Sequence, residues 1–153
     1  MSINYDGSLG YFASLFRALP PPDVASLNGP YKGRFVGPRW LRLLAGPSIA
    51  LGGLGNWWGK EFDGHGQGIN IVLHRGKLQR KLPMQIVLAP SLLDGRTGIS
   101  IAYAPGSPYP WPWIVDEARS IDEKTLLCLT FVNKRGLRRR SFPFILHWEL
   151  GKK

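Results

Sequence analysis

The sequence is poor in cysteine. Cys128 is the only one among 153 residues, so no disulfide can form within the chain. Proteins without disulfides are typical of reducing compartments, and we therefore expect a cytoplasmic protein. Cys128 follows two leucines and precedes a third. We interpret it as a small buried hydrophobe, because a reactive thiol needs an electropositive and partly open setting.

Long hydrophobic runs are also lacking. The most apolar stretch, residues 41–54, is interrupted by Gly46, Pro47, Gly52 and Gly53, so it is too short to span a bilayer. The first residues show no cationic segment followed by an apolar core, and we expect no signal peptide. The sequence has no histidine with a second ligand at metal-binding spacing and no glycine loop that leads from a strand into a helix. We therefore expect neither a structural metal nor a dinucleotide site.

Acidic residues are few. Ten of them stand against twenty basic residues, which gives a formal net charge of +10. Such a charge is typical of proteins that contact nucleic acid, an anionic membrane surface or an acidic ligand. The cations gather in two predicted hairpins, one with Arg75, Lys77, Arg80 and Lys81 and the other with Lys134, Arg135, Arg138, Arg139 and Arg140. We interpret both as solvated surface, because the aromatic residues that nucleic-acid binding would use fall at predicted core positions. Binding of nucleic acid or of an anionic membrane is the alternative.

Aromatic residues, in contrast, are abundant, with six Trp, seven Phe and five Tyr. At this density they either fill a wide core or line a cavity. The stretch Trp57-Trp58-Gly59-Lys60-Glu61-Phe62 concentrates them, and we predict that it forms a plug between the apolar stretch 41–54 and the strands that follow. The 19 glycines and 13 prolines indicate many turns and short elements.

Most of the chain shows the patterns of short strands between turn signals. The predicted strands cover residues 31–37, 69–75, 82–89, 98–104, 114–121, 125–132 and 141–150. Seven or eight strands joined by short turns favour an antiparallel meander that closes into a barrel, and barrels of about eight strands can hold one small ligand. The sequence thus predicts a mainly β protein, with a helix and linker over 1–26 and a single barrel domain over 27–153.

Two helical segments are predicted outside the strands. Residues 8–19 carry apolar side chains at spacings of three and four, with Ser8 as a cap and the prolines 20–22 as a stop. We expect this helix to serve as a lid or end cap. Between Pro38 and Gly55 we predict two short helical pieces, separated by Gly46-Pro47. They would cover the cavity, either by closing the barrel end or as a moving gate.

Two sets of residues resemble known barrel families. Gly29-Pro30-Tyr31-Lys32-Gly33 looks like a variant of the GxWxG signature that opens lipocalin-like, fatty-acid-binding and nitrobindin-type barrels, the calycin group, with Tyr31 in place of Trp. The segments 58–62 (WGKEF), 115–122 (VDEARSID), 125–127 (TLL) and 144–146 (FIL) resemble, in order, the small uncharacterised GXWXG-domain proteins of bacteria, fungi and plants. The likeness covers most of residues 27–149. It implies a lipocalin-like barrel and little about activity.

Charged residues at predicted strand positions are candidates for a binding site. We expect Lys60 and Arg119 to face the cavity, where two cations would hold a carboxylate or enolate of a ligand. On a regular strand Asp116 and Asp122 share one face and Arg119 the other, and a bulge would bring Arg119 and an Asp together. The alternative is an ion pair at the barrel rim.

His147 is a further candidate, within the aromatic strand that ends at Trp148. A lone histidine in such a strand is more often a hydrogen-bonded structural residue than a ligand. The alternatives are a general acid or base and, as similarity to nitrobindin-type barrels suggests, an axial haem ligand. The sequence holds no further haem motif, and no other cofactor is expected.

Three functional hypotheses follow. In the first, the cavity binds a small, largely apolar molecule, with or without an anionic end. The residues expected to line or orient it are Trp57, Trp58, Lys60, Tyr103, Trp111, Trp113, Arg119 and His147. In the second, the same cavity belongs to an isomerase or cyclase, in which Asp116 or His147 moves a proton while Lys60 or Arg119 holds an oxyanion. In the third, the protein binds haem, or interacts with nucleic acid or anionic lipid through its basic surface.

Overall fold

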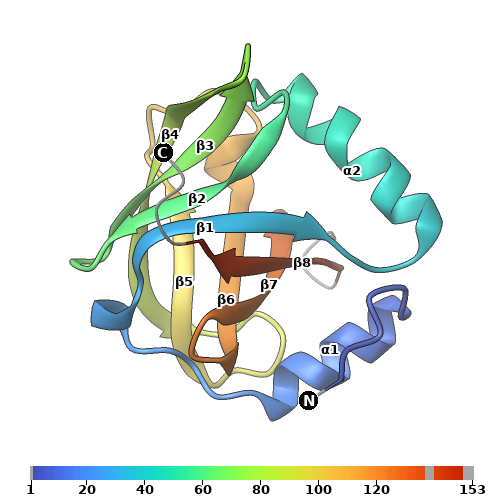
Figure 1. Ribbon diagram of the computed structural model, residues 1–153. Helices are drawn as coiled ribbons and strands as arrows, with labels where there is room; N and C mark the ends of the chain where they lie inside the picture. Colours follow the sequence, from blue (N-terminus) through green and yellow to red (C-terminus); the bar gives the residue numbers. More distant parts are fainter. Residues whose placement is uncertain (1, 137–139, 150–153) are drawn as a thin grey trace.

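The protein is an antiparallel β-barrel with two helices outside it (Figure 1). The computed structural model describes residues 2–136 and 140–149. Within them, eight strands pair in chain order, and β1 pairs with β8 to close the barrel. The strands are β1 Asn28–Phe35, β2 Trp57–Asp63, β3 Gln67–His74, β4 Lys77–Pro90, β5 Thr97–Tyr103, β6 Ile114–Asp122, β7 Thr125–Val132 and β8 Ser141–Trp148. The helices are α1 Leu9–Ala18 and α2 Arg39–Leu51, with single 3₁₀ turns at Val24–Ser26 and Trp111–Trp113. The predicted fold class is confirmed.

The stretch that the sequence presented as a plug is a strand instead. Trp57–Asp63 forms β2 and pairs with both β1 and β3, so the prediction of a plug was wrong. The pairing depends on Gly59, because a Cβ at this position would overlap the carbonyl oxygen of Tyr31 on the neighbouring strand. The glycine therefore lets two strands approach where a pair of tryptophans had suggested a bulky insertion.

Helix α2 is one continuous helix, so the prediction of two pieces was also wrong. Pro47 lies inside it and cannot donate the backbone hydrogen bond that Leu43 would otherwise accept. Both residues are exposed, and water can therefore satisfy the freed carbonyl group. The helix lies across one end of the barrel (Figure 1), as expected of a cover.

Helix α1 forms where the spacing predicted it. Ser8 caps it, since its Oγ accepts a hydrogen bond of 3.0 Å from the backbone N–H of Tyr11. The buried face of the helix packs on the outer side of β7 and β8 rather than on the barrel end. This second cluster, separate from the barrel interior, contains Phe12, Phe16, Leu19, Val36, Leu127, Leu129, Phe131 and Ile145. The helix therefore seals a side wall, and β7 is apolar on both faces, with Cys128 pointing inward as a fully buried residue.

Candidate functional site

The barrel interior contains a cavity beneath α2. Its volume is about 310 Å³. Most of the wall is apolar, and its polar groups gather on β2, β3, β5, β6 and β7. The lining residues are Phe35, Val36, Leu41, Leu44, Ala45, Ser48, Ile49, Leu54, Trp57, Lys60, Asn70, Tyr103, Pro110, Trp111, Ile114, Asp116, Thr130, Val132, Phe142, Pro143 and Phe144. The site is therefore an apolar chamber with one polar patch.

The centre of the polar patch is a buried ion pair. Lys60 Nζ lies 3.3 Å from Asp116 Oδ2, and both side chains are almost fully buried, with 2% and 4% exposed. The hydroxyl of Tyr103 joins them, since it accepts a hydrogen bond of 2.8 Å from Lys60 and donates one of 3.1 Å to Asp116. One positive and one negative charge thus meet in the cavity wall, and the site has no net charge.

Three neutral side chains complete this network. Asn70 Oδ1 accepts hydrogen bonds from Lys60 Nζ at 2.9 Å and from Trp57 Nε1 at 3.1 Å. Thr130 Oγ1 donates to Asp116 Oδ1 at 2.7 Å. Within the described residues, every buried side-chain nitrogen or oxygen atom has a hydrogen-bond partner. The patch is therefore fully satisfied without a ligand, which keeps its geometry rigid.

The protonation states follow from these contacts. Burial alone would lower the pKa of the Lys60 ammonium, but the oxygens of Tyr103 and Asp116 outweigh it and raise that pKa above its usual value. Burial, and then the Asp116 carboxylate, raise the pKa of Tyr103 to about 12. At neutral pH the patch therefore holds a charged lysine and a neutral tyrosine. An uncharged amine nucleophile is not available at Lys60 under these conditions.

A β-bulge explains why Trp57 and Lys60 both point inward. Three positions apart, they would lie on opposite faces of a regular strand. The pairing of β2 with β3 shifts register between Trp57 and Gly59, which adds one residue and turns both side chains into the barrel. The ring of Trp57 then lies so close to Gly33 that a Cβ there would overlap it. Glycine at position 33 thus leaves room for the indole against the backbone of β1.

Helix α2 covers the chamber without being tightly packed. Leu41, Ala45 and Ile49 face the cavity, yet no residue of the helix is fully buried. Its C-terminal end is held by the indole of Trp111, whose Nε1 donates to the Gly52 carbonyl at 2.6 Å. Near the N-terminal end of the helix, Arg42 forms an ion pair of 2.9 Å with Asp6.

The structure brings only some of the predicted site residues to the cavity. Trp57, Lys60, Tyr103, Trp111 and the candidate proton carrier Asp116 line it. Trp58 and Trp113 are half-buried and lie outside the lining. Trp113 packs edge-on against Tyr109 and beneath Lys134.

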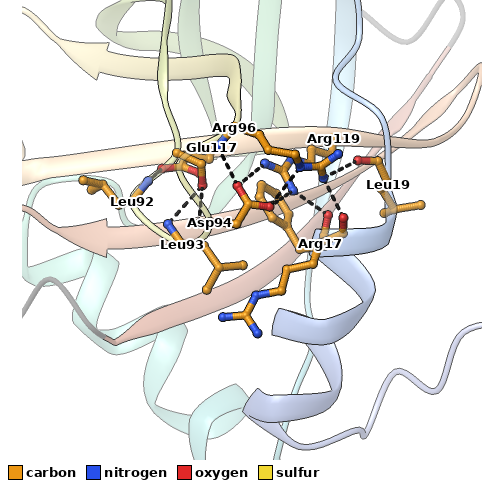
Figure 2. Close-up of polar contacts among 10 residues, drawn as sticks. Arg17, Leu19, Leu92, Leu93, Asp94, Arg96, Glu117 and Arg119 are labelled. Carbon is orange, nitrogen blue, oxygen red and sulfur yellow. Dashed lines mark hydrogen bonds and ion pairs between the residues drawn. The ribbon is translucent and has the colours of Figure 1, made fainter.

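Arg119 does not face the cavity, so that prediction was wrong. It lies on the outer face of β6, where it donates two hydrogen bonds to the Asp94 carboxylate, at 2.7 and 2.8 Å (Figure 2). A third bond, of 2.9 Å, goes to the carbonyl of Phe16 in α1, and Arg96 binds the carbonyls of Arg17 and Leu19. These bonds attach the C-terminal end of α1 to the barrel wall. The role of Arg119 is structural.

His147 is also outside the cavity. It is exposed, and its Nδ1 lies 2.9 Å from the Thr125 hydroxyl of the neighbouring strand. Its inward-facing neighbour is Leu146, which belongs to the barrel core. A haem ligand or a general acid at His147 would need the opposite orientation, so both roles lose their geometric basis. In the part of the chain that the structure describes, neither histidine nor cysteine lines the cavity.

Sequence reasoning missed Asn70 and Thr130. A signal for Asn70 was present, because it is the one strongly polar residue in the run Ile69-Asn70-Ile71-Val72. A fully buried amide in such a run must find partners inside the protein. Thr130 had no comparable signal, since threonine is common on strand surfaces.

The basic hairpins lie where the sequence placed them. Arg75 and Gly76, with φ of 50° and 77°, form the tight turn between β3 and β4. Arg80, on β4, pairs with Glu61 of β2 at the barrel surface. In the second hairpin, Arg138 and Arg139 lie outside the described residues.

Comparisons with known proteins establish the fold alone. The sequence matches no protein-family model and no curated protein. The structure is similar to the crystal structure of a protein from Thermomonospora curvata, with a TM-score of 0.72 and 17% identity, over 94% of this chain and 89% of that one. At this identity the match supports the barrel architecture and carries no function. The likeness to GXWXG-domain proteins stays a prediction.

No helix in residues 2–136 and 140–149 is long and apolar enough to cross a membrane. The same residues contain no cluster of three or more His, Cys, Asp or Glu side chains that would suit a metal ion.

Proposed function

We propose that this protein binds a small, largely apolar molecule inside the barrel. The observation that carries the proposal is the cavity beneath α2, about 310 Å³ in volume, with apolar walls and one rigid polar patch. Small-molecule sites commonly have volumes of about 300–1,000 Å³ and combine apolar walls with a few placed polar groups. This volume is at the lower end of that range, which favours a compact ligand. The single, buried Cys128 supports a reducing, cytoplasmic setting.

The polar patch favours a neutral ligand. The charge of Lys60 is balanced by Asp116, and its ammonium donors are directed at Asn70, Tyr103 and Asp116. A ligand carboxylate would have to displace one of these buried partners, and its own charge would enter an apolar chamber. Thr130 donates to Asp116 and can still accept a hydrogen bond from a ligand hydroxyl. The best fit is thus an apolar molecule with one hydroxyl group, rather than an anion.

A competition experiment tests both parts of this proposal. The neutral fluorescent probe N-phenyl-1-naphthylamine is titrated into the protein, and decanol and decanoate then compete for its site. We expect saturable binding of the probe and stronger displacement by the alcohol. If decanoate displaces the probe more strongly, and Lys60→Met abolishes that preference, the ligand is anionic. If the probe does not bind at all, the cavity is not a ligand site of this kind.

Proton transfer in the same cavity is a second candidate function. It is favoured by the convergence of Asp116, Tyr103 and Lys60 at one polar patch of the cavity. Asp116 would take a proton from the carbon beside a carbonyl group, and the Tyr103 and Lys60 donors that the neutralised carboxyl group releases would stabilise the oxyanion. Hydrogen–deuterium exchange of a small apolar ketone in D₂O, followed by NMR, distinguishes this role. An enzyme accelerates the exchange and loses that effect in Asp116→Asn, whereas a binder leaves the rate unchanged.

A further inference from the structure

One end of the barrel differs sharply from the other in charge. In an antiparallel meander, successive connections lie at alternate ends. The end that carries α2 therefore also carries the β3–β4, β5–β6 and β7–β8 connections, and Figure 1 shows the β3–β4 tip beside the C-terminal end of α2. We call this the α2 end, made of residues 36–56, 74–77, 104–113, 133–136 and 140.

The α2 end contains cations and no acidic residue of its own. None of its segments includes Asp or Glu. Its basic residues are Arg39, Arg42, Arg75, Lys77, Lys134, Arg135 and Arg140. Among the described residues, one ion pair brings a carboxylate to it from elsewhere, that of Asp6 with Arg42. The opposite end, in contrast, has Asp63, Asp94, Asp122 and Glu123 at its turns.

Apolar side chains are exposed among these cations. On α2, Leu51 is 92% exposed, Leu43 66% and Trp40 55%. Tyr109, in the β5–β6 connection, is 70% exposed. A soluble surface seldom gathers so many large apolar groups, and such a patch usually marks an interaction site. Aliphatic groups with a tryptophan, surrounded by lysine and arginine, match the two layers of a bilayer surface, its acyl boundary and its anionic headgroups.

We propose that the α2 end docks on an anionic lipid surface, with Leu43, Leu51 and Trp40 entering the headgroup boundary. Nucleic acid fits this end less well, because it would leave the exposed leucines without a partner and would favour aromatic stacking platforms. Docking in this orientation turns the cover of the cavity toward the membrane. An exchange of apolar ligand between the two would rest on the proposed function, but docking itself does not.

The test is co-sedimentation of the full chain with ligand-free vesicles of phosphatidylcholine, with and without phosphatidylglycerol. We expect binding only to the anionic vesicles, and weaker binding at high salt. Each cation near a membrane contributes about fivefold in partitioning, so the double variant Lys77→Gln, Arg135→Gln is expected to bind about twenty-fivefold more weakly. Leu51→Ser should reduce binding severalfold.

Matched controls lie away from the α2 end. Lys124→Gln changes an exposed cation in the β6–β7 turn, and Leu88→Ser changes a leucine on β4 that is 66% exposed. Both should bind as the wild type does.

The proposal is overturned if anionic vesicles do not sediment the protein, or if the controls weaken binding as much as the test variants. It is also overturned if a DNA duplex displaces the vesicles and binds Leu51→Ser normally. If light scattering shows that the wild type is a dimer and Leu51→Ser a monomer, a second copy of the chain covers the α2 end instead of a membrane. Because no ligand is present, failure here leaves the cavity proposal untouched.

Discussion

Lys60 and Asp116 form an ion pair inside the barrel, with Nζ and Oδ2 3.3 Å apart and less than a twentieth of each side chain exposed. The two residues come from strands on different sides of the interior, β2 and β6, and meet through the hydroxyl of Tyr103. The pair makes the polar patch of the cavity neutral. It also links the two sides of the barrel in a setting where an unpaired charge is costly.

Removal of one member of this pair should destabilise the fold strongly. In Asp116→Asn, the Lys60 ammonium stays buried without its carboxylate. We expect the free energy of unfolding to fall by about 3–5 kcal/mol, as for other broken buried pairs. The double variant Lys60→Met, Asp116→Asn should lose much less than the sum of the two single losses. Urea denaturation of the wild type, of Lys60→Met, of Asp116→Asn and of the double variant measures this coupling.

The surface pair of Arg80 and Glu61 is the control, because exposed pairs contribute only about 0–1 kcal/mol. Arg80→Gln should therefore change stability little. Additive losses in the double-mutant cycle at Lys60 and Asp116 would show that the two charges do not act as a pair.

A substitution at Arg119 should lower the stability of the fold without changing the affinity of the cavity for a ligand. Arg119 is 3% exposed and is held by Asp94 and the Phe16 carbonyl under α1. Arg119→Gln is expected to lower the free energy of unfolding by about 1–3 kcal/mol, because Asp94 keeps only Arg96 as an ionic partner and the Phe16 carbonyl loses its donor. Under conditions where the variant stays folded, its affinity for N-phenyl-1-naphthylamine should equal that of the wild type. A specific loss of affinity without loss of stability would return Arg119 to the binding site.

Acid should weaken this same attachment of α1. The Arg119 guanidinium beside Asp94 holds the pKa of that carboxyl well below its usual range, whereas an unfolded chain has an Asp pKa of about 3.9. A carboxyl group whose pKa is lower in the folded state stabilises the fold above its unfolded pKa. That stability is lost as protonation sets in, from about pH 5 downward.

Asp94→Asn should accordingly show a shallower fall in stability between neutral and acid pH. Some slope should remain, because hydrogen bonds from backbone N–H groups also lower the pKa values of Asp63 and Asp122. Urea midpoints measured across this pH range make the comparison. Equal slopes in the variant and the wild type would rule out a contribution from Asp94.

Gly33 should be needed for the position of Trp57. In Gly33→Ala the new methyl group overlaps the indole ring, which must move toward the cavity or force the strands apart. We expect a loss of about 1–3 kcal/mol, as for other overpacked sites, and a shift in tryptophan fluorescence. Gly106→Ala is the control, since a Cβ there meets no atom within 4 Å. Comparable effects in both variants would contradict the close contact of Trp57 with Gly33.

Periodicity and turn chemistry were enough to predict β1 and the strands from β3 to β8, although β4 begins at Lys77 and not at the predicted residue 82. The strand β2 escaped prediction, since the bulge near Trp58 breaks its alternation and its aromatic mass suggested a plug. For α2 we predicted two pieces separated by Gly46-Pro47, because helix propensity treats proline as a break. Propensity does not take into account that water can bind the carbonyl group that Pro47 leaves without a donor. In both cases tertiary context overrode a local rule.

The site was only partly predictable for a related reason. Aromatic abundance pointed correctly to Trp57, Tyr103 and Trp111 as cavity residues. Arg119 and His147 were placed on the wrong face because strands β6, β7 and β8 are covered on both sides. Helix α1 packs on their outer surface, so apolar neighbours such as Ile145 do not reveal which face is the interior. Only the closed barrel shows that Asp116 points inward and Arg119 outward.

The most direct test of the cavity as a ligand site is to fill it from the lid. Ala45 faces the cavity from α2, whereas Ala50, on the same helix, is exposed and outside the lining. The stoichiometry of N-phenyl-1-naphthylamine binding is measured by fluorescence titration for the wild type, Ala45→Trp and Ala50→Trp. The account predicts one probe per chain in the wild type and in Ala50→Trp, and none in Ala45→Trp. Equal binding by all three proteins would place the probe on the exposed surface and would contradict a ligand site inside the barrel.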